Sequence, residues 1–158
     1  MINAIFAADS HGGIGHRGSM PWQGISSDLA RFKHITTNSV IVMGRNTWDS
    51  PDMPSPLPKR ENFVVTRDTT FNHPGATAID LSDLPYLEKF YPHKRIFIIG
   101  GKQLLMAALP LIKRIYYTRI YGEYQSDVKL DLKKIFNGFL IEDSDTTRRC
   151  TFYTYIRR

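Results

Sequence analysis

The stretches IVMGRNT (residues 41–47) and IFIIGG (residues 96–101) decide the fold of this chain. Each begins with an apolar run that is too short for a helix, which is typical of a strand covered on both faces. Each then ends in glycine or small polar residues, where backbone N–H groups are free to approach an anionic ligand. Two such strand ends lying side by side predict a cradle for a dinucleotide.

Other apolar runs extend this pattern along the chain. Strands are expected at residues 2–8, 40–43, 63–65, 95–99, 115–120 and 152–156. Helices are expected at residues 26–36, where the serines suit an N-cap, and at residues 102–109, with shorter ones after Asn46 and Ser82. The alternation indicates a parallel sheet, whereas the last two strands, with no helix pattern between them, indicate an antiparallel edge. We predict one α/β domain over residues 1–158, with a central, mostly parallel mixed sheet of about eight strands flanked by helices.

Length and composition favour an ordinary globular domain. A chain of 158 residues buries enough apolar surface to fold without metals or disulfides. Its single cysteine, Cys150, excludes an internal disulfide framework and is typical of a reducing compartment. Asp9 interrupts the N-terminal apolar run, and no run approaches membrane-spanning length. We therefore expect a cytoplasmic protein with no membrane partner.

The formal net charge of +6 has two interpretations. It reflects either a solvated basic surface or a field that attracts anionic ligands. The basic residues are scattered, and only the pairs 148–149 and 157–158 are locally dense. Because no basic face interleaved with aromatic residues is visible, we do not expect a nucleic-acid partner.

The string GIGHRG (residues 13–18) matches the G-x-G-x-x-G pattern of dinucleotide-binding folds. That motif has to open a helix, but the following GSMPW (residues 18–22) breaks any helix within a turn. The stretch from Gly12 to Gly24 is better interpreted as a mobile, glycine-hinged loop beside a site, with Met20 and Trp22 as lid side chains. A plain surface loop is the alternative.

Asp28 is the candidate catalytic acid. At about 100° per residue, the helix places it on the same face as Leu29, Phe32 and Ile35. An aspartate in a first helical turn also answers the helix dipole, and Arg31 is in reach to pair with it. A carboxylate held on an apolar face without a function would be costly, which favours a functional role.

Polar residues after the strands are candidates for binding phosphate. Arg45 and Thr47 follow one strand, and Thr66 and Arg67 follow another. Ordinary strand-end salt bridges are the alternative for either arginine. The pair GG (residues 100–101) precedes a helix and permits close backbone approach to a ligand, although a tight turn without a ligand remains possible.

Metal and nucleophile chemistry are not indicated. The five histidines show no ligand spacing, and Cys150 lies in the last predicted strand with no adjacent base. No metal site is expected.

Taken in order along the chain, these motifs resemble dihydrofolate reductase, nearly from end to end. The matching strings are IG (14–15) with MPW (20–22), DLxxFK (28–33), MGRxTW (43–48), LP (57–58) with RxN (60–62), IGG (99–101) and YT (117–118). The resemblance implies reduction of 7,8-dihydrofolate to tetrahydrofolate with NADPH, which supplies one-carbon carriers for thymidylate and purine synthesis. It also implies antifolate-type small molecules as ligands, and we expect a monomer.

The resemblance assigns a substrate site. Asp28, helped by Thr118 through an ordered water, would bind the pterin and promote protonation at N5, with Met20 and Trp22 completing the catalytic group. Arg60 would bind the α-carboxylate of the glutamate tail. The substrate-binding residues implied are Ile5, Phe6, Asp28, Leu29, Phe32, Leu57, Arg60 and Thr118.

The resemblance also assigns a cofactor site, with some residues around the nicotinamide and others along the adenosine and phosphate arms. Ala7, Ile14, Met20 and Ile99 would surround the nicotinamide, and Gly15 also belongs to the cofactor site. The arms would be lined by Gly44, Arg45, Asn46, Thr47, Thr66, Arg67, Gly100, Gly101, Gln103 and Leu104, and Lys102 is also counted with the cofactor site. The basic charge is then intelligible, because both ligands are anionic.

The chain departs from the family pattern at four positions. Phe6 stands where a small residue is common, Lys102 where a third glycine is frequent, Gln103 where a basic residue occurs, and Leu105 where a tyrosine often reaches the nicotinamide. These departures affect ligand affinity more than the reaction. A pyrimidine reductase of riboflavin synthesis, with the same fold, and a basic nucleic-acid-binding module are the competing hypotheses.

Overall fold

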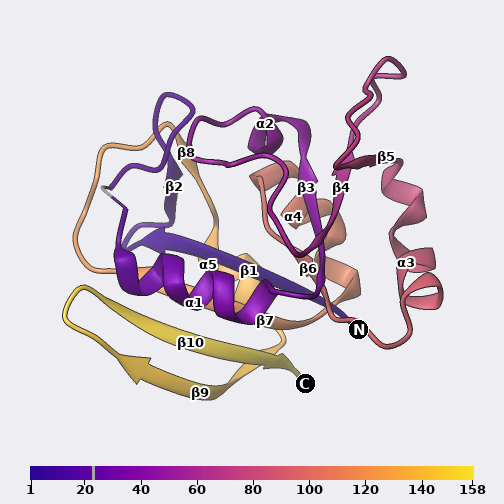
Figure 1. Cartoon of the computed structure of the whole chain (residues 1–158). Coiled ribbons are helices and arrows are strands. Elements are labelled where there is room, and N and C mark those ends of the chain that lie inside the picture. Colours follow the sequence, from indigo (N-terminus) through magenta and orange to yellow (C-terminus); the bar gives the residue numbers. More distant parts are fainter. Residues whose placement is uncertain (23) are drawn as a thin grey trace.

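The computed structural model describes residues 1–22 and 24–158. Within them the chain forms one eight-stranded sheet in the order β5-β4-β3-β6-β1-β7-β10-β9 (Figure 1). Its strands are β1 (Ile2–Asp9), β3 (Val40–Gly44), β4 (Glu61–Val65), β5 (Thr77–Ile79), β6 (Ile96–Ile98), β7 (Ile112–Ile120), β9 (Phe139–Thr146) and β10 (Cys150–Arg157). β10 is antiparallel to both of its neighbours, and the other pairs are parallel. The predicted mixed sheet with an antiparallel C-terminal edge is confirmed.

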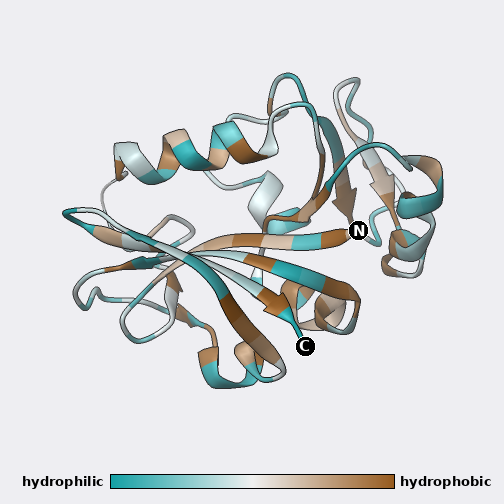
Figure 2. Cartoon of the chain, turned by 90° about the horizontal axis from the view of Figure 1, so that it is seen from below, coloured by the Kyte–Doolittle hydropathy of each residue, from teal (hydrophilic) through white to brown (hydrophobic). Residues whose placement is uncertain are grey.

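The helices cover both faces of this sheet. They are α1 (Ser26–Thr36), α2 (Arg45–Trp48), α3 (Leu84–Phe90), α4 (Lys102–Ala108) and α5 (Leu132–Phe136), with 3-10 turns η1 (Leu81–Asp83) and η2 (Leu109–Leu111). α1 packs on one face through half-buried Phe32 and Ile35, whereas α3, α4 and α5 contribute side chains to the core of the other face (Figure 2). The two faces of the sheet are therefore covered by separate clusters of apolar side chains.

The bounds of α1 agree with the sequence prediction, but its cap does not. The N-cap residue is Ile25, whose side chain makes no cap hydrogen bond, and Ser26 is already the first helical residue. The expectation of a serine cap is therefore wrong. Entry into the helix is instead fixed by packing, since Ile25 is 3% exposed in a cluster with Trp22 and Phe152.

The structure contains elements that the search for apolar runs did not predict. They are β5, β9, α5 and a second sheet made by β2 (Gly13–Gly15) and β8 (Val128–Lys129). β9 is an edge strand that begins with three apolar residues and continues with five polar ones, and only Phe139 of it is buried. α5 lies between β7 and β10, where no helix was predicted, and is only five residues long. Its cap is Asp131, which accepts a hydrogen bond from the Lys134 N–H at 3.2 Å.

The loop predicted over residues 12–24 is partly a strand. β2 pairs with β8, and the approach is close, because a Cβ on Gly13 would lie 2.2 Å from the Ser126 Oγ. Only glycine fits at that position without rearrangement. Gln23, inside the same stretch, lies outside the described residues. The hypothesis that the stretch is a mobile lid stays a prediction.

No helix among the described residues is long and apolar enough to cross a membrane. Strands of the central sheet carry much of the hydrophobic, brown colour in Figure 2. β3 and β6 are buried from Val40 to Met43 and from Ile96 to Ile98, as expected for strands covered on both faces.

Candidate active site

The ends of β3 and β6 lie side by side, as the sequence predicts. The strands are parallel with Val42 opposite Ile98, and the Gly44 N–H donates a hydrogen bond to the Gly100 carbonyl at 2.8 Å. Gly44 is the N-cap of α2, and Gly101 is the N-cap of α4. Two helices therefore begin next to each other at the carboxyl edge of the sheet, where ligands bind in open α/β sheets.

Glycines leave this edge free of side chains. Gly100 has φ +130°, a conformation that other residues rarely adopt, and a Cβ on it would lie 3.4 Å from the Thr47 Oγ1. A Cβ on Gly44 would lie 3.6 Å from the Gly101 N. These distances are ordinary contacts, so the glycines do not relieve a clash. Without side chains at these positions, the backbone stays accessible beside the Thr47 hydroxyl. Such a surface is suited to binding the phosphates of a dinucleotide.

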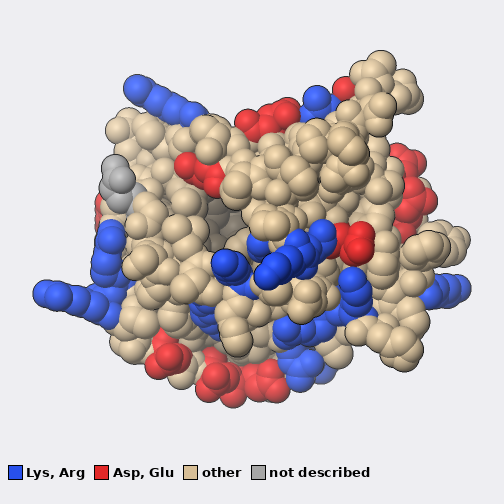
Figure 3. Space-filling view, in the orientation of Figure 1, with Lys and Arg blue, Asp and Glu red and all other residues tan. Residues whose placement is uncertain are grey.

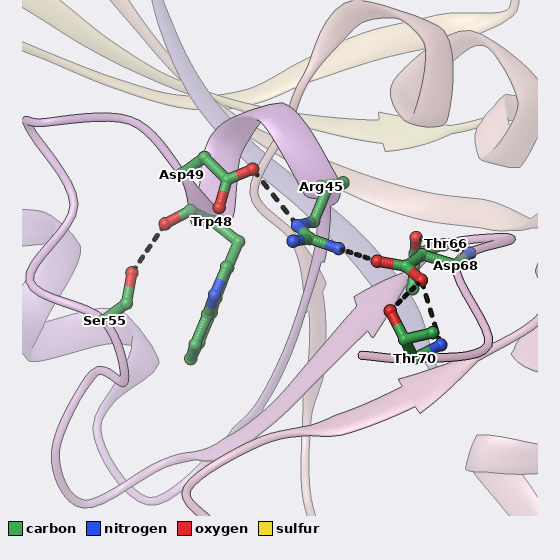
Figure 4. Close-up of polar contacts among 7 residues, drawn as sticks. All are labelled: Arg45, Trp48, Asp49, Ser55, Thr66, Asp68 and Thr70. Atoms are coloured by element: carbon green, nitrogen blue, oxygen red, sulfur yellow. Dashed lines mark hydrogen bonds and ion pairs between the residues drawn. The ribbon is translucent and has the colours of Figure 1, made fainter. Parts of the chain in front are cut away.

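Arg45 is engaged by two carboxylates at this edge (Figure 4). Its Nε lies 3.1 Å from the Asp49 Oδ2, and its Nη1 lies 2.9 Å from the Asp68 Oδ2. The guanidinium also lies 5.1 Å from the centroid of the Phe71 ring. The hydrogen bond to Asp68, aided by the charge of Asp49, raises the Arg45 pKa. The strand-end salt bridges that the sequence left open are thus present.

Asp68 is held in place by the turn that follows β4. Its Oδ1 accepts hydrogen bonds from the Thr70 N–H at 2.9 Å and the Thr70 hydroxyl at 2.6 Å, and its own N–H donates to the Thr66 Oγ1 at 3.1 Å. The bonds from Thr70 and then from Arg45 lower the Asp68 pKa to about 2. Arg67, between Thr66 and Asp68, is exposed.

The remaining predicted cofactor residues divide into two groups. Asn46, Lys102 and Gln103 are exposed near the two helix starts. The Leu104 side chain, 7% exposed, packs in the main core, so a role for it in lining the phosphate arms is limited to its backbone. Leu105, where a tyrosine was noted as frequent, is also buried in that core.

Asp28 is held by Thr118 across the cleft between α1 and β7. The Thr118 hydroxyl donates to the Asp28 Oδ1 at 2.7 Å, a direct bond between residues that are 90 positions apart. Thr118 is 3% exposed and lies between Ala7 of β1 and Phe152 of β10 in the sheet. The sheet thus fixes the hydroxyl, and α1 brings the carboxylate to it.

Burial dominates the ionisation of Asp28. Removal from water raises its pKa above the ordinary 3.8, and the Thr118 hydrogen bond and the charge of Arg31 partly oppose this rise. No ion pair to Asp28 within 4.0 Å occurs among the described residues, so Arg31 acts at longer range. The simple alternative of a surface charge on a helix end is therefore disfavoured.

Apolar side chains from α1, β1 and the segment before β4 form a cluster on this side of the sheet. Ile5, Leu57 and half-buried Phe32 share one cluster with Ile99. Leu57 is held by the side-chain amide of Asn62. The Leu57 N–H donates to the Asn62 Oδ1 at 3.0 Å, and the Asn62 Nδ2 donates to the Leu57 carbonyl at 2.9 Å. These residues form walls suited to a flat aromatic ring.

Leu29 does not face the core as predicted. Its side chain is 50% exposed. The Leu29 Cδ1 lies beside Gly24, 3.5 Å from where a Cβ on that glycine would be. The predicted apolar face of α1 is therefore narrower than expected and consists of Phe32 and Ile35.

Phe6 was predicted to bind substrate, but the structure places it elsewhere. It packs in the main core, with ring centroids 5.3 Å from Tyr117 and 6.4 Å from Phe136 of α5. Ile5 instead belongs to the cluster of α1. Successive strand residues point to opposite faces, so Phe6 faces away from Asp28.

The residues predicted around a nicotinamide are brought together only in part. Ala7 and Met20 pack with Trp22 near Phe152, and Ile99 lies in the neighbouring cluster of Ile5. The side chain of Ile14 packs against the main core, and Gly15 pairs with Val128.

Contacts that the sequence did not reveal hold the segment containing Met20. The Met20 N–H donates to the Asp52 Oδ2 at 2.7 Å, and the Ser50 hydroxyl donates to the Gly18 carbonyl at 3.0 Å. Trp22 meets the Tyr124 ring edge-on at 6.0 Å between centroids. No sequence signal predicts these contacts, because each joins two loops through the tertiary fold.

Arg60 lies at the open end of the apolar walls. Its Nη1 donates to the Thr36 Oγ1 at 3.0 Å, its Nε donates to the Pro58 carbonyl at 2.9 Å, and its guanidinium lies 5.9 Å from the Phe32 ring centroid. Partial burial lowers its pKa. These contacts orient the guanidinium and leave it without an ion pair among the described residues.

The surface seen in Figure 3 is hollowed between α1 and the region of α2. Lysine and arginine side chains gather along the α1 side of this hollow. A basic rim around a partly apolar hollow attracts anionic ligands. Among residues 1–22 and 24–158, no three or more His, Cys, Asp or Glu side chains group in a way that could hold a metal ion.

Comparisons with known proteins agree with this architecture. The chain is 38% identical over 128 residues to the dihydrofolate reductase of Bacillus subtilis, covering 80% of this chain and 73% of that protein. It is 37% identical over 121 residues to the dihydrofolate reductase of Mycobacterium tuberculosis, covering 76% and 71%. The type 9 dihydrofolate reductase of Escherichia coli is 32% identical over 158 residues, covering 92% and 84%.

The sequence model described as dihydrofolate reductase matches residues 1–157, which is nearly the whole chain. This match favours dihydrofolate reductase over the competing hypothesis of a different reductase with the same fold. The chain therefore belongs to the dihydrofolate reductase family.

Proposed function

We propose that this member of the family reduces 7,8-dihydrofolate with NADPH as the hydride donor, and that Asp28 is the carboxylate at the reacting ring. Reduction of dihydrofolate to tetrahydrofolate is the reaction of the family. The observation that carries the role of Asp28 is its hydrogen bond to Thr118 at 2.7 Å inside a partly apolar cleft. The roles of individual residues are our proposal.

Asp28 acts on the pterin through hydrogen bonding and charge. Its Oδ1 accepts from Thr118, which leaves the other oxygen available to accept from ring N–H groups of the substrate. A carboxylate held out of water stabilises a positive charge more strongly than a solvated one, so it favours protonation at N5. Ile5, Phe32 and Leu57 orient the ring and exclude water from its faces.

A bound NADPH supplies a hydride to the pterin. Gly44, Thr47, Gly100 and Gly101 would offer the backbone and hydroxyl surface for its pyrophosphate. Ala7 is the β1 partner of Thr118, and it packs with Met20 in the cluster of Trp22 and Phe152, which would hold the nicotinamide. Arg67, exposed beside Thr66, would bind the 2′-phosphate together with Arg45. This arrangement supports a preference for NADPH over NADH.

Arg60 binds the glutamate tail of the folate. Its guanidinium is oriented by Thr36 and Pro58 at the end of the walls formed by Phe32 and Leu57. An oriented guanidinium matches a carboxylate with paired hydrogen bonds. We further propose that antifolate-type small molecules occupy the same walls and that the protein is a monomer.

The test follows the absorbance of NADPH with and without dihydrofolate, for the parent and for Asp28→Asn. Consumption that requires dihydrofolate, and that the variant loses, supports the proposal. NADPH consumption that is independent of dihydrofolate, or a fully active variant, contradicts it. Size-exclusion chromatography with light scattering tests the monomer.

A further inference from the structure

Arg31 lies one helical turn after Asp28 on α1 and is turned toward the sheet. Its guanidinium carbon lies 4.6 Å from the centroid of the Phe152 ring and 6.0 Å from that of Tyr116. Phe152 is the β10 partner of Thr118, which donates to Asp28. The cation therefore lies over β7 and β10, the strands that carry and flank the hydroxyl partner of Asp28.

The surroundings of Arg31 leave its charge without a direct partner. Within the described part of the chain, no carboxylate oxygen lies within 4.0 Å of it, and its buried Nη1 has no hydrogen-bond partner. Burial lowers the pKa of Arg31, and the titratable groups whose charges oppose this shift are Asp28 on its own helix, Tyr116 of β7, Asp143 of β9 and Cys150 of β10. Among these groups Asp28 has the largest effect on Arg31.

We propose that Arg31 is the fixed countercharge of Asp28, a positioning residue that favours the ionised carboxylate while standing away from it. This inference rests on the proposed role of Asp28 at the pterin. An ion pair in direct contact would occupy the carboxylate oxygen that the substrate needs. A cation at longer range stabilises the negative charge and leaves that oxygen open.

A guanidinium suits this position better than an ammonium. It is more weakly hydrated, stays charged when partly buried, and stacks on aromatic rings. The Phe152 ring therefore holds the charge in place without neutralising it. Because the site is screened from solvent, the effect on Asp28 persists at salt concentrations that suppress interactions between exposed charges.

A carbon-13 NMR titration of protein labelled at aspartate Cγ tests this proposal directly, without ligands. The Asp28 signal is identified by its loss in Asp28→Asn. In Arg31→Met and in Arg31→Gln, the midpoint of the Asp28 titration should rise by about one pH unit, a tenfold change in the ionisation constant. Arg31→Lys should restore most of the shift.

Lys33→Met is the matched control, because it removes one positive charge from an exposed position of the same helix. It should leave the midpoint nearly unchanged. An unchanged midpoint in folded Arg31→Met or Arg31→Gln, or an equal shift in Lys33→Met, would show that Arg31 only packs on Phe152. Circular dichroism establishes that each variant is folded.

The same variants separate this inference from the proposed function. If Asp28 governs the reaction, the pH profile of NADPH consumption should move with the titration midpoint in Arg31→Met. If Asp28→Asn retains full turnover, the role of Asp28 at the pterin fails, even where the NMR shift is observed. A missing NMR shift with an inactive Asp28→Asn refutes only the role of Arg31.

Discussion

Asp28 and Asp68 are both aspartates, but they lie in contrasting surroundings. Asp28 is half-buried, its one hydrogen-bond donor among the described residues is a neutral hydroxyl, and burial raises its pKa. Asp68 is exposed, accepts two bonds from Thr70 and one from Arg45, and has a pKa of about 2. Two residues of the same type therefore ionise differently, because one is shielded from solvent and the other is exposed and hydrogen-bonded. The shielded carboxylate is the better candidate for chemistry.

The two shifts have opposite consequences for stability. Because the folded-state pKa of Asp28 is raised, the ionised group opposes folding, and stability rises as pH falls through that pKa. Because the pKa of Asp68 is lowered from 3.8 to about 2, its contribution is present above 3.8 and is lost as pH falls toward 2. The ionised Asp28 therefore lowers the stability of the fold, whereas the ionised Asp68 stabilises the turn that follows β4.

The largest expected effect follows from removing the charge of Asp28. Asp28→Asn should slow hydride transfer at neutral pH by about a hundredfold or more, because the amide cannot stabilise a protonated N5. The defect should shrink in acid, where the substrate arrives already protonated. Single-turnover hydride transfer across the acid range measures both. A native rate at neutral pH would end the assignment of Asp28 as the catalytic carboxylate.

The same variant sharpens the comparison through stability. Thermal unfolding of Asp28→Asn at neutral pH should show no loss, because the variant removes an ionised group whose burial opposes folding. As pH falls through the raised Asp28 pKa, the parent should gain stability relative to the variant. A clear loss of stability at neutral pH would mean that Asp28 serves mainly as a charge at the start of α1.

Arg60 tests the substrate end of the cleft. Arg60→Ala should weaken folate binding by about 10- to 150-fold, the range for a hydrogen-bonded charge, and leave a bare pteridine nearly unaffected. Lys59→Gln removes a neighbouring exposed charge as a control. Equal weakening of both ligands would show that Arg60 is structural, acting through Thr36 and Pro58. Fluorescence titration of each ligand provides the measurement.

Arg67 tests the phosphate end. Arg67→Ala should lose about tenfold in affinity for NADPH and little for NADH, because only NADPH carries the 2′-phosphate. Arg158→Ala, which removes an exposed charge at the C-terminus, should affect neither cofactor. Equal losses for the two cofactors would remove Arg67 from the phosphate site. Calorimetric titration of both nucleotides decides the point.

The smallest effect is expected at Asp68. Asp68→Asn weakens the ion pair between the Asp68 Oδ2 and the Arg45 Nη1, which lie 2.9 Å apart. It also removes a negative charge next to Arg67. It should tighten NADPH binding by no more than about fivefold, since exposed pairs contribute only about 0.2–1 kcal/mol. NADH should change less. Weaker NADPH binding would instead mean that Asp68 orders the turn that presents Arg67.

Some errors of prediction were avoidable from the sequence. Ile5, Phe6 and Ala7 follow one another in β1, so they do not all face one ligand. The alternation of a strand separates Phe6 from Ile5, and the structure confirms this separation. Leu29 was misplaced for a different reason, because a helical face indicates direction but not whether another element covers it.

Other features were beyond the sequence because they join distant parts of the chain. The contact of Arg45 with Asp68 spans 23 positions, and the contact of Met20 with Asp52 spans 32. β9 is polar over its last five residues, and this part of the strand is defined by its pairing with β10. Local periodicity carries no information about such partners.

The sequence by itself determined the buried strands β3 and β6, their glycine ends and the bounds of α1, because apolar runs and helical periodicity are local properties. Tertiary structure alone decided that Thr118 reaches Asp28 directly, that Asp68 reaches Arg45, and that Arg31 lies over Phe152. Each of these depends on sheet order and register, which bring residues up to 121 positions apart into contact. Burial, and with it the ionisation of Asp28, exists only after that assembly.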